Sequence, residues 1–397
     1  MLNRILGNAD PVDVNSRRTL FAAMYMAVIG PEVFIVQPGF VLGMVKYLGF
    51  SETTAGDIAS AEMWGIAITT VIMTFFAARF RWRHVFAGSL LIMIIGNLAS
   101  LYADAPMWFG ACRFVAGFGA GGLVSLGFAV VGLTHNPDRN FGWLIMWVLA
   151  YGALVLLAMP TAYELVGLSG VIIFFALFPA SGLAFVRWLP DSSQEHTHAA
   201  ADAVDLPAPQ RAFALAGIFI YFLGQGVVWA YLFLIGLAGG ASEQDVAYGL
   251  TASQFAGVAG AFCAALLGNR IGRTLPLGAS IMLTLLPLLA LFGPTGALVY
   301  GIMVCIYNYA WNVAQPYMLA AMAAFDRSGR TVINATACQM LGLANGPWIA
   351  ARVINDEGFA NVIWLGIALF AMSLGMLLVP VMKHRELTVM HTVKSTK

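Results

Sequence analysis

The chain has 397 residues, of which 60% are hydrophobic and only 10% are charged. Ordinary soluble domains are about 45–50% apolar and about 25% charged, so the composition excludes a water-soluble protein of this size. The 20 Lys and Arg residues nearly balance the 19 Asp and Glu residues, so no net basic field would attract nucleic acid. The sequence predicts an integral membrane protein.

A helix that crosses the hydrocarbon core of a bilayer needs about 20 mostly apolar residues. Apolar runs of this kind, separated by charge clusters and by Pro or Gly turns, predict about twelve membrane-spanning helices. Several of the connecting loops are very short, so we expect neighbouring helices to pack antiparallel. In chain order the predicted helices cover residues 20–47, 52–78, 85–103, 107–133, 141–163, 167–189, 212–237, 244–268, 275–293, 296–324, 331–354 and 359–382.

Residues 190–211 differ from the rest of the chain because they are polar and acidic and contain prolines. This composition is typical of a linker. The halves on either side of it repeat, since Ser51 and Ser242 each precede an apolar run that ends in a cluster of arginines. The sequence therefore predicts an N-terminal six-helix bundle over residues 1–189, a cytoplasmic linker over 190–211, and a C-terminal six-helix bundle with a cytoplasmic tail over 212–397.

The positively charged residues predict the orientation of the chain. When the termini and the even-numbered loops are placed on one side, 17 of the 20 Lys and Arg residues fall on that side. Cytoplasmic loops carry an excess of Lys and Arg. We therefore expect a multi-pass protein of the inner membrane with both termini in the cytoplasm.

The sequence carries no signal for metal or cofactor chemistry. The six histidines fall in loops or tails, and no Walker-type phosphate-binding loop is present. The four cysteines lie in apolar runs without metal-ligand spacing, which favours a role as small buried residues; they are Cys112, Cys263, Cys305 and Cys338. We expect no enzyme activity, no bound metal and no cofactor.

The passage from Arg113 to Gly121, which includes Gly117, has an arginine followed by spaced glycines. It is similar to the Arg-x-x-x-Gly-x-Gly pattern in the fourth helix of the Major Facilitator Superfamily. It is one of three passages that resemble motifs of this family, and the resemblance spans nearly the whole chain. Physically, Gly117 and Gly121 are one turn apart and allow a neighbouring helix to approach closely. The passage that ends in Gly346-Pro347 is similar to the Gly-x-x-x-Gly-Pro pattern of the family's antiporters, although it lies in the eleventh helix rather than the fifth.

The third passage is the loop between the eighth and ninth helices, which resembles the family's cytoplasmic Gly-x(n)-Asp-Arg-x-Gly-Arg motif. Asn269 replaces the usual Asp, and the first-half counterpart of this loop keeps the positive charge but lacks the acid and the glycine. The resemblance implies gating roles for Arg79, Arg83, Asn269, Arg270, Gly272 and Arg273.

The resemblance also implies an all-α fold of two pseudo-symmetric six-helix bundles, with a substrate cavity lined by the first, fourth, seventh and tenth helices. In this family a buried arginine of the fourth helix is linked to proton coupling.

Three charged residues are predicted inside the membrane: Glu32, Glu62 and Arg113. A charge at the middle of a bilayer costs about 2.5–3.5 kcal/mol on insertion scales, so each one needs an ion-pair partner, contact with water or a functional role. An arginine between two carboxylates offsets much of this cost. One interpretation is proton coupling through these three residues, and the other is a static ion pair that fixes the packing of the helices.

Polar and aromatic side chains in the membrane are the candidates for substrate contact. The tenth helix carries Asn308, Trp311, Asn312 and Gln315 at offsets of three, four and seven, which place them on one face. Amides on a helix in lipid must face protein or water, so the alternative role is hydrogen bonding between helices. The further candidates are Gln37, Trp64, Gln225, Trp229, Gln339 and Asn345.

We therefore expect a proton-coupled secondary transporter that moves a small organic solute by alternating access, the solute being an organic anion, a zwitterion or an aromatic compound. Its partners would be this solute, protons and the lipid bilayer, and the chain would act as a monomer. A multidrug or metabolite:proton antiporter is the alternative within the same fold. A non-transporting membrane receptor or a membrane-embedded enzyme is the remote alternative.

Overall fold

The computed structural model describes residues 12–134, 137–191, 204–268, 270–325, 330–355 and 358–395. Within these ranges the chain is almost entirely helical, and no strand is present apart from an isolated bridge between Asn355 and Gly358. Eight of the described helices are long and apolar enough to cross a membrane. The prediction of an all-α membrane protein is therefore confirmed.

The described chain divides into two compact units. Unit 1 comprises Met1–His196 together with the short segments Trp229–Leu234 and Pro347–Arg352. Unit 2 comprises Thr197–Val228, Ile235–Gly346 and Val353–Lys397. The helices of unit 1 are α2 (Arg17–Ile29), α3 (Glu32–Ile35), α4 (Gln37–Leu48), α5 (Glu52–Phe76), α6 (Trp82–Ser100), α7 (Pro106–Gly132) and α8 (Pro137–Gly182), with the 3-10 turns η1 (Ala77–Arg79) and η2 (Val186–Trp188).

The first predicted span, residues 20–47, is broken into α2, α3 and α4 rather than formed as one helix. Pro31 and Pro38 each lack a backbone N–H, so neither residue can donate to the helical ladder. Pro31 directly precedes α3, and Pro38 lies in the first turn of α4. The breaks place Glu32 and Gln37 at the first positions of two short helices.

Helix α8 contains both the fifth and the sixth predicted spans. Its 46 residues are interrupted at Gly167, where φ is 64°. Glycine occupies this left-handed region without the steric penalty that a Cβ would bring. The two predicted segments, 141–163 and 167–189, meet at this glycine.

The helices of unit 2 repeat the order of those in unit 1. They are α9 (Ala208–Ala238), α10 (Glu243–Leu267), α11 (Thr274–Ala290), α12 (Gly296–Ala324), α13 (Arg330–Val353) and α14 (Ala360–Ser395), of which α9 and α13 contribute the two short segments of unit 1. Helix α9 begins at Ala208, inside the segment 190–211 that we predicted as a linker, whose residues 192–203 lie outside the described ranges. Helix α14 continues to Ser395, well beyond the predicted end of the last span.

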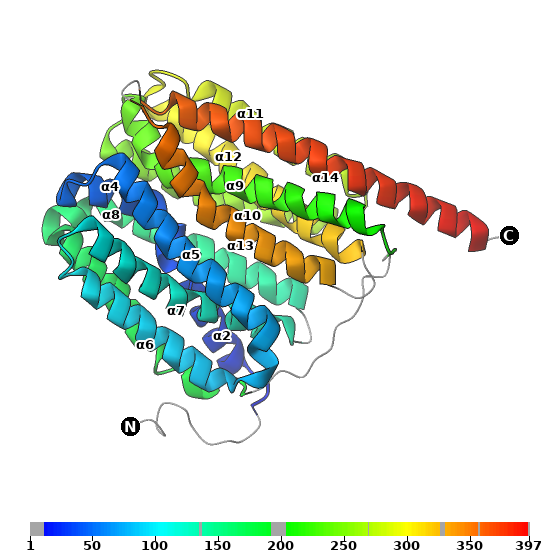
Figure 1. Cartoon of the computed structure of the whole chain (residues 1–397), viewed down its shortest axis with the longest axis horizontal. Coiled ribbons are helices and arrows are strands. Elements are labelled where there is room, and N and C mark those ends of the chain that lie inside the picture. Colours follow the sequence, from blue (N-terminus) through cyan, green and yellow to red (C-terminus); the bar gives the residue numbers. More distant parts are fainter. Residues whose placement is uncertain are drawn as a thin grey trace. The chain divides into compact units, whose positions relative to one another are not determined.

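Corresponding helices make corresponding contacts inside each unit. In unit 1, α7 packs most extensively on α5 and then on α6, and the labelled ribbons lie side by side (Figure 1). In unit 2, α12 packs in the same way on α10 and then on α11. The starts of the repeated helices also match, because the Ser51 and Ser242 hydroxyls accept hydrogen bonds from the backbone N–H groups of Thr54 and Asp245. Serine at this position satisfies a donor that the helix cannot pair by itself.

Candidate functional site

A buried ion pair joins α5 to α7 in the interior of unit 1. The Arg113 guanidinium donates from Nε to Glu62 Oε2 at 3.1 Å and from Nη2 to Glu62 Oε1 at 2.5 Å. The Arg113 side chain has no exposed surface, and that of Glu62 is 7% exposed. This two-pronged geometry is the strongest form of a carboxylate–guanidinium contact, and it brings together two of the three predicted membrane charges.

Two further residues complete the surroundings of Arg113. Its Nη1 donates to the Oδ1 of Asn97 on α6, and its guanidinium lies 5.2 Å from the centre of the Phe40 ring on α4. Asn97 is itself fully buried and donates from Nδ2 to the Phe175 carbonyl oxygen at 2.7 Å. Sequence reasoning did not select Asn97, although an uncharged amide inside the third apolar segment was the available signal.

Glu32 is the third member of this cluster, and its environment differs from that of Glu62. Its side chain is fully buried, and neither carboxylate oxygen has a hydrogen-bond partner in the described structure. Arg113, Glu62 and Asn97 are its polar neighbours. The structure therefore collects two carboxylates and one guanidinium from three helices, and only one of the carboxylates is paired.

Small residues bring the helices close enough for this cluster to form. A Cβ on Gly117 would collide with the carbonyl oxygen of Glu62, and one on Gly121 would lie 2.5 Å from the carbonyl oxygen of Ile66. A Cβ on Gly65 of α5 would likewise lie 2.3 Å from the carbonyl oxygen of Phe114 on α7. Close contact through small residues is the common way for helices to associate in lipid. The motif glycines thus set the distance between the helices that carry Glu62 and Arg113.

Three of the predicted substrate contacts lie in unit 1. Gln37 is buried, and its Oε1 has no hydrogen-bond partner among the described residues. Trp64 is half-buried on α5. Trp229, in the segment of α9 that belongs to unit 1, donates from its indole Nε1 to the Phe34 carbonyl oxygen at 3.0 Å. Its side chain is therefore engaged by the backbone of the broken first span.

In unit 2, Gln225 is held by two tyrosines that sequence reasoning did not select. The Tyr307 hydroxyl donates to Gln225 Oε1, and Gln225 Nε2 donates to the Tyr221 hydroxyl at 3.0 Å. All three side chains are fully buried. Because the amide uses its oxygen and one of its donors in this way, Gln225 links α9 to α12 through hydrogen bonds.

The amides of α12 also bond chiefly within the protein. Asn308 Nδ2 donates to the Ser253 hydroxyl at 3.3 Å, and Asn312 Nδ2 donates to Asn308 Oδ1 at 2.9 Å. Trp311 packs edge-on against Tyr307, with ring centroids 6.5 Å apart. The predicted face of α12 therefore contacts the hydrogen-bonded group of Tyr221, Gln225 and Tyr307. Gln315 is half-buried one turn further along the helix.

The two polar candidates of α13 show no contact with this group among the described residues. Asn345 donates to the Leu341 carbonyl oxygen of its own helix at 2.8 Å, and Gln339 is buried. Gly346 has a packing role, since a Cβ there would lie 2.5 Å from the Cα of Gly226 on α9. Pro347 follows it inside α13.

The predicted gating residues differ in their surroundings. Arg83 is buried and donates from Nε to the Leu189 carbonyl oxygen at 2.7 Å, whereas Arg79 is exposed beside the Phe76 ring. In the second loop, Gly272 has φ of 72°, a conformation that favours glycine, between the exposed Arg270 and the half-buried Arg273. Asn269 lies outside the described residues.

No three His, Cys, Asp or Glu side chains in the described part of the chain are placed to hold a metal ion. The arrangement instead offers one buried charge cluster in unit 1 and one network of amides and tyrosines in unit 2. Both arrangements consist of buried polar side chains joined by hydrogen bonds between helices.

Known proteins resemble parts or all of this chain. Residues 21–347 match the family model of the Major Facilitator Superfamily. Over 81 residues, which are 20% of this chain and 18% of the relative, the chain is 36% identical to the gentisate transporter of Corynebacterium glutamicum. Over 143 residues, which are 33% of both proteins, it is 26% identical to the niacin transporter NiaP of Acinetobacter baylyi. The chain thus matches a third or less of the length of each of these relatives.

A solved structure resembles the whole fold. The crystal structure of a mutant of the nucleoside transporter NupG superposes with a TM-score of 0.70, at 13% sequence identity, over 92% of this chain and 98% of that one. At this identity the likeness shows the fold alone. Because the family model covers most of the sequence, the chain belongs to the Major Facilitator Superfamily.

Proposed function

We propose that this protein is a proton-coupled transporter of small organic acids, with aromatic carboxylates as the preferred class. The observation that carries the proton coupling is Glu32, a fully buried carboxylate without a hydrogen-bond partner in the described structure, beside an arginine that Glu62 already occupies. Burial of an uncompensated charge is costly. Among Glu32, Glu62 and Arg113, Glu32 is therefore the residue whose charge is least compensated by its surroundings.

The charge balance of the cluster suggests how coupling works. With Glu62 and Arg113 both ionised, the cluster is neutral when Glu32 holds a proton and carries one negative charge when Glu32 has lost it. Closure of the site against water favours the neutral state, and entry of water lowers the cost of the charged state. Alternating access to the two sides would then let Glu32 load a proton on one side and release it on the other.

The substrate class is supported by two relatives and by the polar groups of the protein. Gentisate and niacin, the compounds named for the two matched transporters, are both aromatic carboxylic acids. In unit 2, Asn312 and Gln315 carry half-buried amides, which we assign as donors for such a ligand, whereas Gln225 is already bonded to Tyr221 and Tyr307. We further propose that the chain acts as a monomer in the cytoplasmic membrane with both termini in the cytoplasm, in keeping with its Lys and Arg distribution.

Reconstituted vesicles provide the test of proton coupling. Purified protein with Glu32→Gln should still exchange labelled nicotinate or gentisate across the membrane, because the glutamine keeps the size of the side chain and mimics the protonated state. It should not accumulate either compound in response to an imposed pH gradient, which the wild-type protein should do.

Glu164→Gln is the matched control, since Glu164 is an exposed carboxylate on α8 outside the cluster. That variant should respond to the pH gradient as the wild-type protein does. Gradient-driven accumulation that is undiminished in Glu32→Gln would contradict the coupling role. Failure of the wild-type protein to exchange any aromatic acid would contradict the substrate class.

A further inference from the structure

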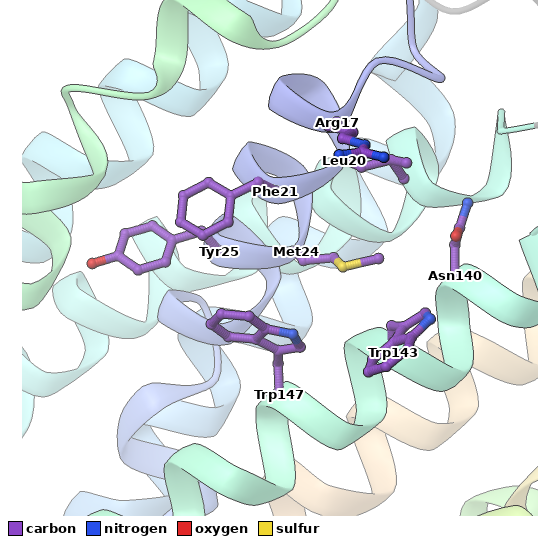
Figure 2. A pocket seen from close by; sticks show the side chains of 8 residues that line it. All are labelled: Arg17, Leu20, Phe21, Met24, Tyr25, Asn140, Trp143 and Trp147. Atoms are coloured by element: carbon purple, nitrogen blue, oxygen red, sulfur yellow. The ribbon is translucent and has the colours of Figure 1, made fainter.

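Unit 1 contains a cavity of about 280 Å³ between α2 and α8. None of the residues around it was selected from the sequence as a site residue. Figure 2 shows Phe21 and Tyr25 on α2 facing Trp147 on α8 at one end, and Arg17 and Asn140 toward the other end. Binding pockets for small ligands have volumes of about 300–1,000 Å³, so this cavity suits a compact ligand of one or two rings.

The aromatic walls of the cavity are held in place by other rings. Phe21 meets Trp147 edge to face with centroids 6.1 Å apart, which joins the two helices across the cavity. Phe21 also stacks on Tyr25 at 5.7 Å, and Tyr25 meets Phe185 at 5.1 Å. Edge-to-face and stacked contacts fix the orientation of each ring. The walls therefore present rigid flat surfaces, which are complementary to a planar aromatic ligand.

The polar groups of the cavity favour an anion. Arg17 supplies a positive charge, and no carboxylate is among the described residues that line the cavity. Arg17 begins α2, whose start is fixed by a hydrogen bond from the Thr19 N–H to the Ser16 hydroxyl at 3.2 Å. Asn140 is buried and donates to the Thr134 hydroxyl at 2.8 Å, which orients its amide. An arginine binds a carboxylate through two parallel hydrogen bonds.

A column of rings connects this cavity to the charge cluster around Glu32. Tyr151 lies one turn beyond Trp147 on α8, and its ring stacks on Phe178 with centroids 5.3 Å apart. Phe178 in turn meets Tyr25 of the cavity at 5.4 Å. The Tyr151 hydroxyl is buried without a hydrogen-bond partner in the described structure, and it lies within electrostatic reach of Glu32. The column of rings thus ends in a buried hydroxyl that is open to a further contact.

We propose that this cavity is a binding site for a small planar aromatic carboxylate, with the ligand ring against Trp147 and Phe21 and its carboxylate on Arg17. The proposal rests on the proposed function for the class of ligand, and it adds a site in unit 1 to the polar groups of unit 2. A carboxylate ligand bound here would lie at the end of the ring column opposite Tyr151.

The contribution of the Arg17 charge to ligand binding is tested by substituting Arg17 and its neighbour Arg18. Binding of labelled nicotinate and gentisate is measured at equilibrium on the purified full chain in lipid nanodiscs. Arg17→Gln should weaken binding of both acids by about tenfold or more, because a charge-assisted pair is lost. Arg18→Gln is the matched control, since Arg18 is exposed as Arg17 is but does not line the cavity, and it should leave the affinity within about twofold of wild type. Competition by nicotinamide, the uncharged counterpart, should be the same in both variants.

The ring surface is tested in the same assay. Trp147→Ala should weaken binding of the acids by about tenfold, and Trp147→Phe should restore a large part of the loss, because stacking requires a ring rather than an indole N–H. Trp147 is 44% exposed, so its truncation removes little of the core. Trp108→Ala is the control, since Trp108 is an exposed tryptophan of α7 outside the cavity.

The outcomes separate this inference from the proposed function. If the wild-type protein binds the acids and both Arg17→Gln and Trp147→Ala bind them equally well, the cavity is not the site, and the proposed function is unaffected. If Arg17→Gln loses binding but the wild-type protein shows no uptake driven by a pH gradient, the cavity stands and the proton coupling fails. If the wild-type protein binds none of these acids, the inference is overturned.

Discussion

Arg113 has no exposed surface and contacts Glu62, Asn97 and the ring of Phe40. Each of these partners comes from a different helix, so the guanidinium holds four helices around one point. The contacts satisfy its donors with two carboxylate oxygens and one amide oxygen, which is the condition for an arginine to be tolerated in a dry interior. Glu32 makes no such bond in the described structure, and Arg113 is a charged neighbour of its carboxylate.

Removal of Arg113 should therefore leave two buried carboxylates without a counter-ion. We expect Arg113→Met to lower the free energy of unfolding by about 3–5 kcal/mol, the cost of breaking a buried pair. The double variant Arg113→Met with Glu62→Met should recover a large part of this loss, because it removes both members of the pair. Unfolding of the purified protein in denaturant measures both values. Equal stability of the single and double variants would show that the pair is not the reason for the loss.

Asn97 provides a second test at the residue scale. Asn97→Leu keeps the size of the side chain but leaves Arg113 Nη1 and the Phe175 carbonyl oxygen without their partner. We expect a loss of about 1–3 kcal/mol in the free energy of unfolding. Asn345→Leu is the matched change, because Asn345 bonds only to a carbonyl of its own helix in the contacts described here, and it should cost less. A smaller loss for Asn97→Leu than for Asn345→Leu would contradict the structural role of Asn97.

At the scale of the helices, the contact between α5 and α7 depends on glycines that alternate between the two elements. Gly65 of α5 lies against the backbone of α7, and Gly117 and Gly121 of α7 lie against the backbone of α5. A carbonyl oxygen cannot move aside as the end of a side chain can, so these positions tolerate no Cβ without a shift of a whole helix. Any such shift would also separate Glu62 from Arg113.

Two glycines of the same helix make this a controlled experiment. Gly117→Ala should reduce both the thermal stability and the transport rate, because its Cβ would overlap the Glu62 carbonyl oxygen. Gly110→Ala should be neutral or stabilising by up to about 1 kcal/mol, since its Cβ would meet only the Ile58 side chain at 3.5 Å and alanine favours a helix. Thermal unfolding and vesicle uptake measure the two effects. The same result for both variants would contradict the packing argument.

For the whole molecule, the distribution of Lys and Arg predicts which side of the membrane each loop occupies. Asp104, between α6 and α7, should lie outside, and Glu386, near the end of α14, should lie in the cytoplasm. Both residues are exposed. In a cysteine-free background, Asp104→Cys should react with a membrane-impermeant maleimide in intact cells, and Glu386→Cys should react only after the cells are opened. The reverse pattern would overturn the predicted orientation.

How much the sequence revealed differs between the elements and the site. The spans were predictable because the thickness of the hydrocarbon core sets the length of an apolar run, and this is a local property of the chain. The interruption of residues 20–47 into three helices is traceable to Pro31 and Pro38. The charges Glu32, Glu62 and Arg113 were also visible, since each stands alone in an apolar segment.

The partners of those residues were less visible. Tyr221 and Tyr307, which hold Gln225, lie in segments where aromatic residues are common, so nothing in the sequence marks them as hydrogen-bonding groups. Asn97 could have been selected as an amide in the membrane, but its bond to Arg113 depends on how α6 and α7 are rotated against each other. That rotation is fixed by the packing of many side chains and has no signature in either segment alone.

By itself, the sequence determined that this protein crosses the membrane many times, that it belongs to a family with two repeated bundles, and that a few charges are buried within it. Only the tertiary structure decided that Glu62 is paired while Glu32 is not, and that Arg17 and Trp147, 130 positions apart, line one cavity. The physical reason is that hydrophobicity acts along the chain, whereas an ion pair or a cavity requires atoms of separate helices to meet within a few ångströms. The depth and rotation at which the helices pack decide those meetings.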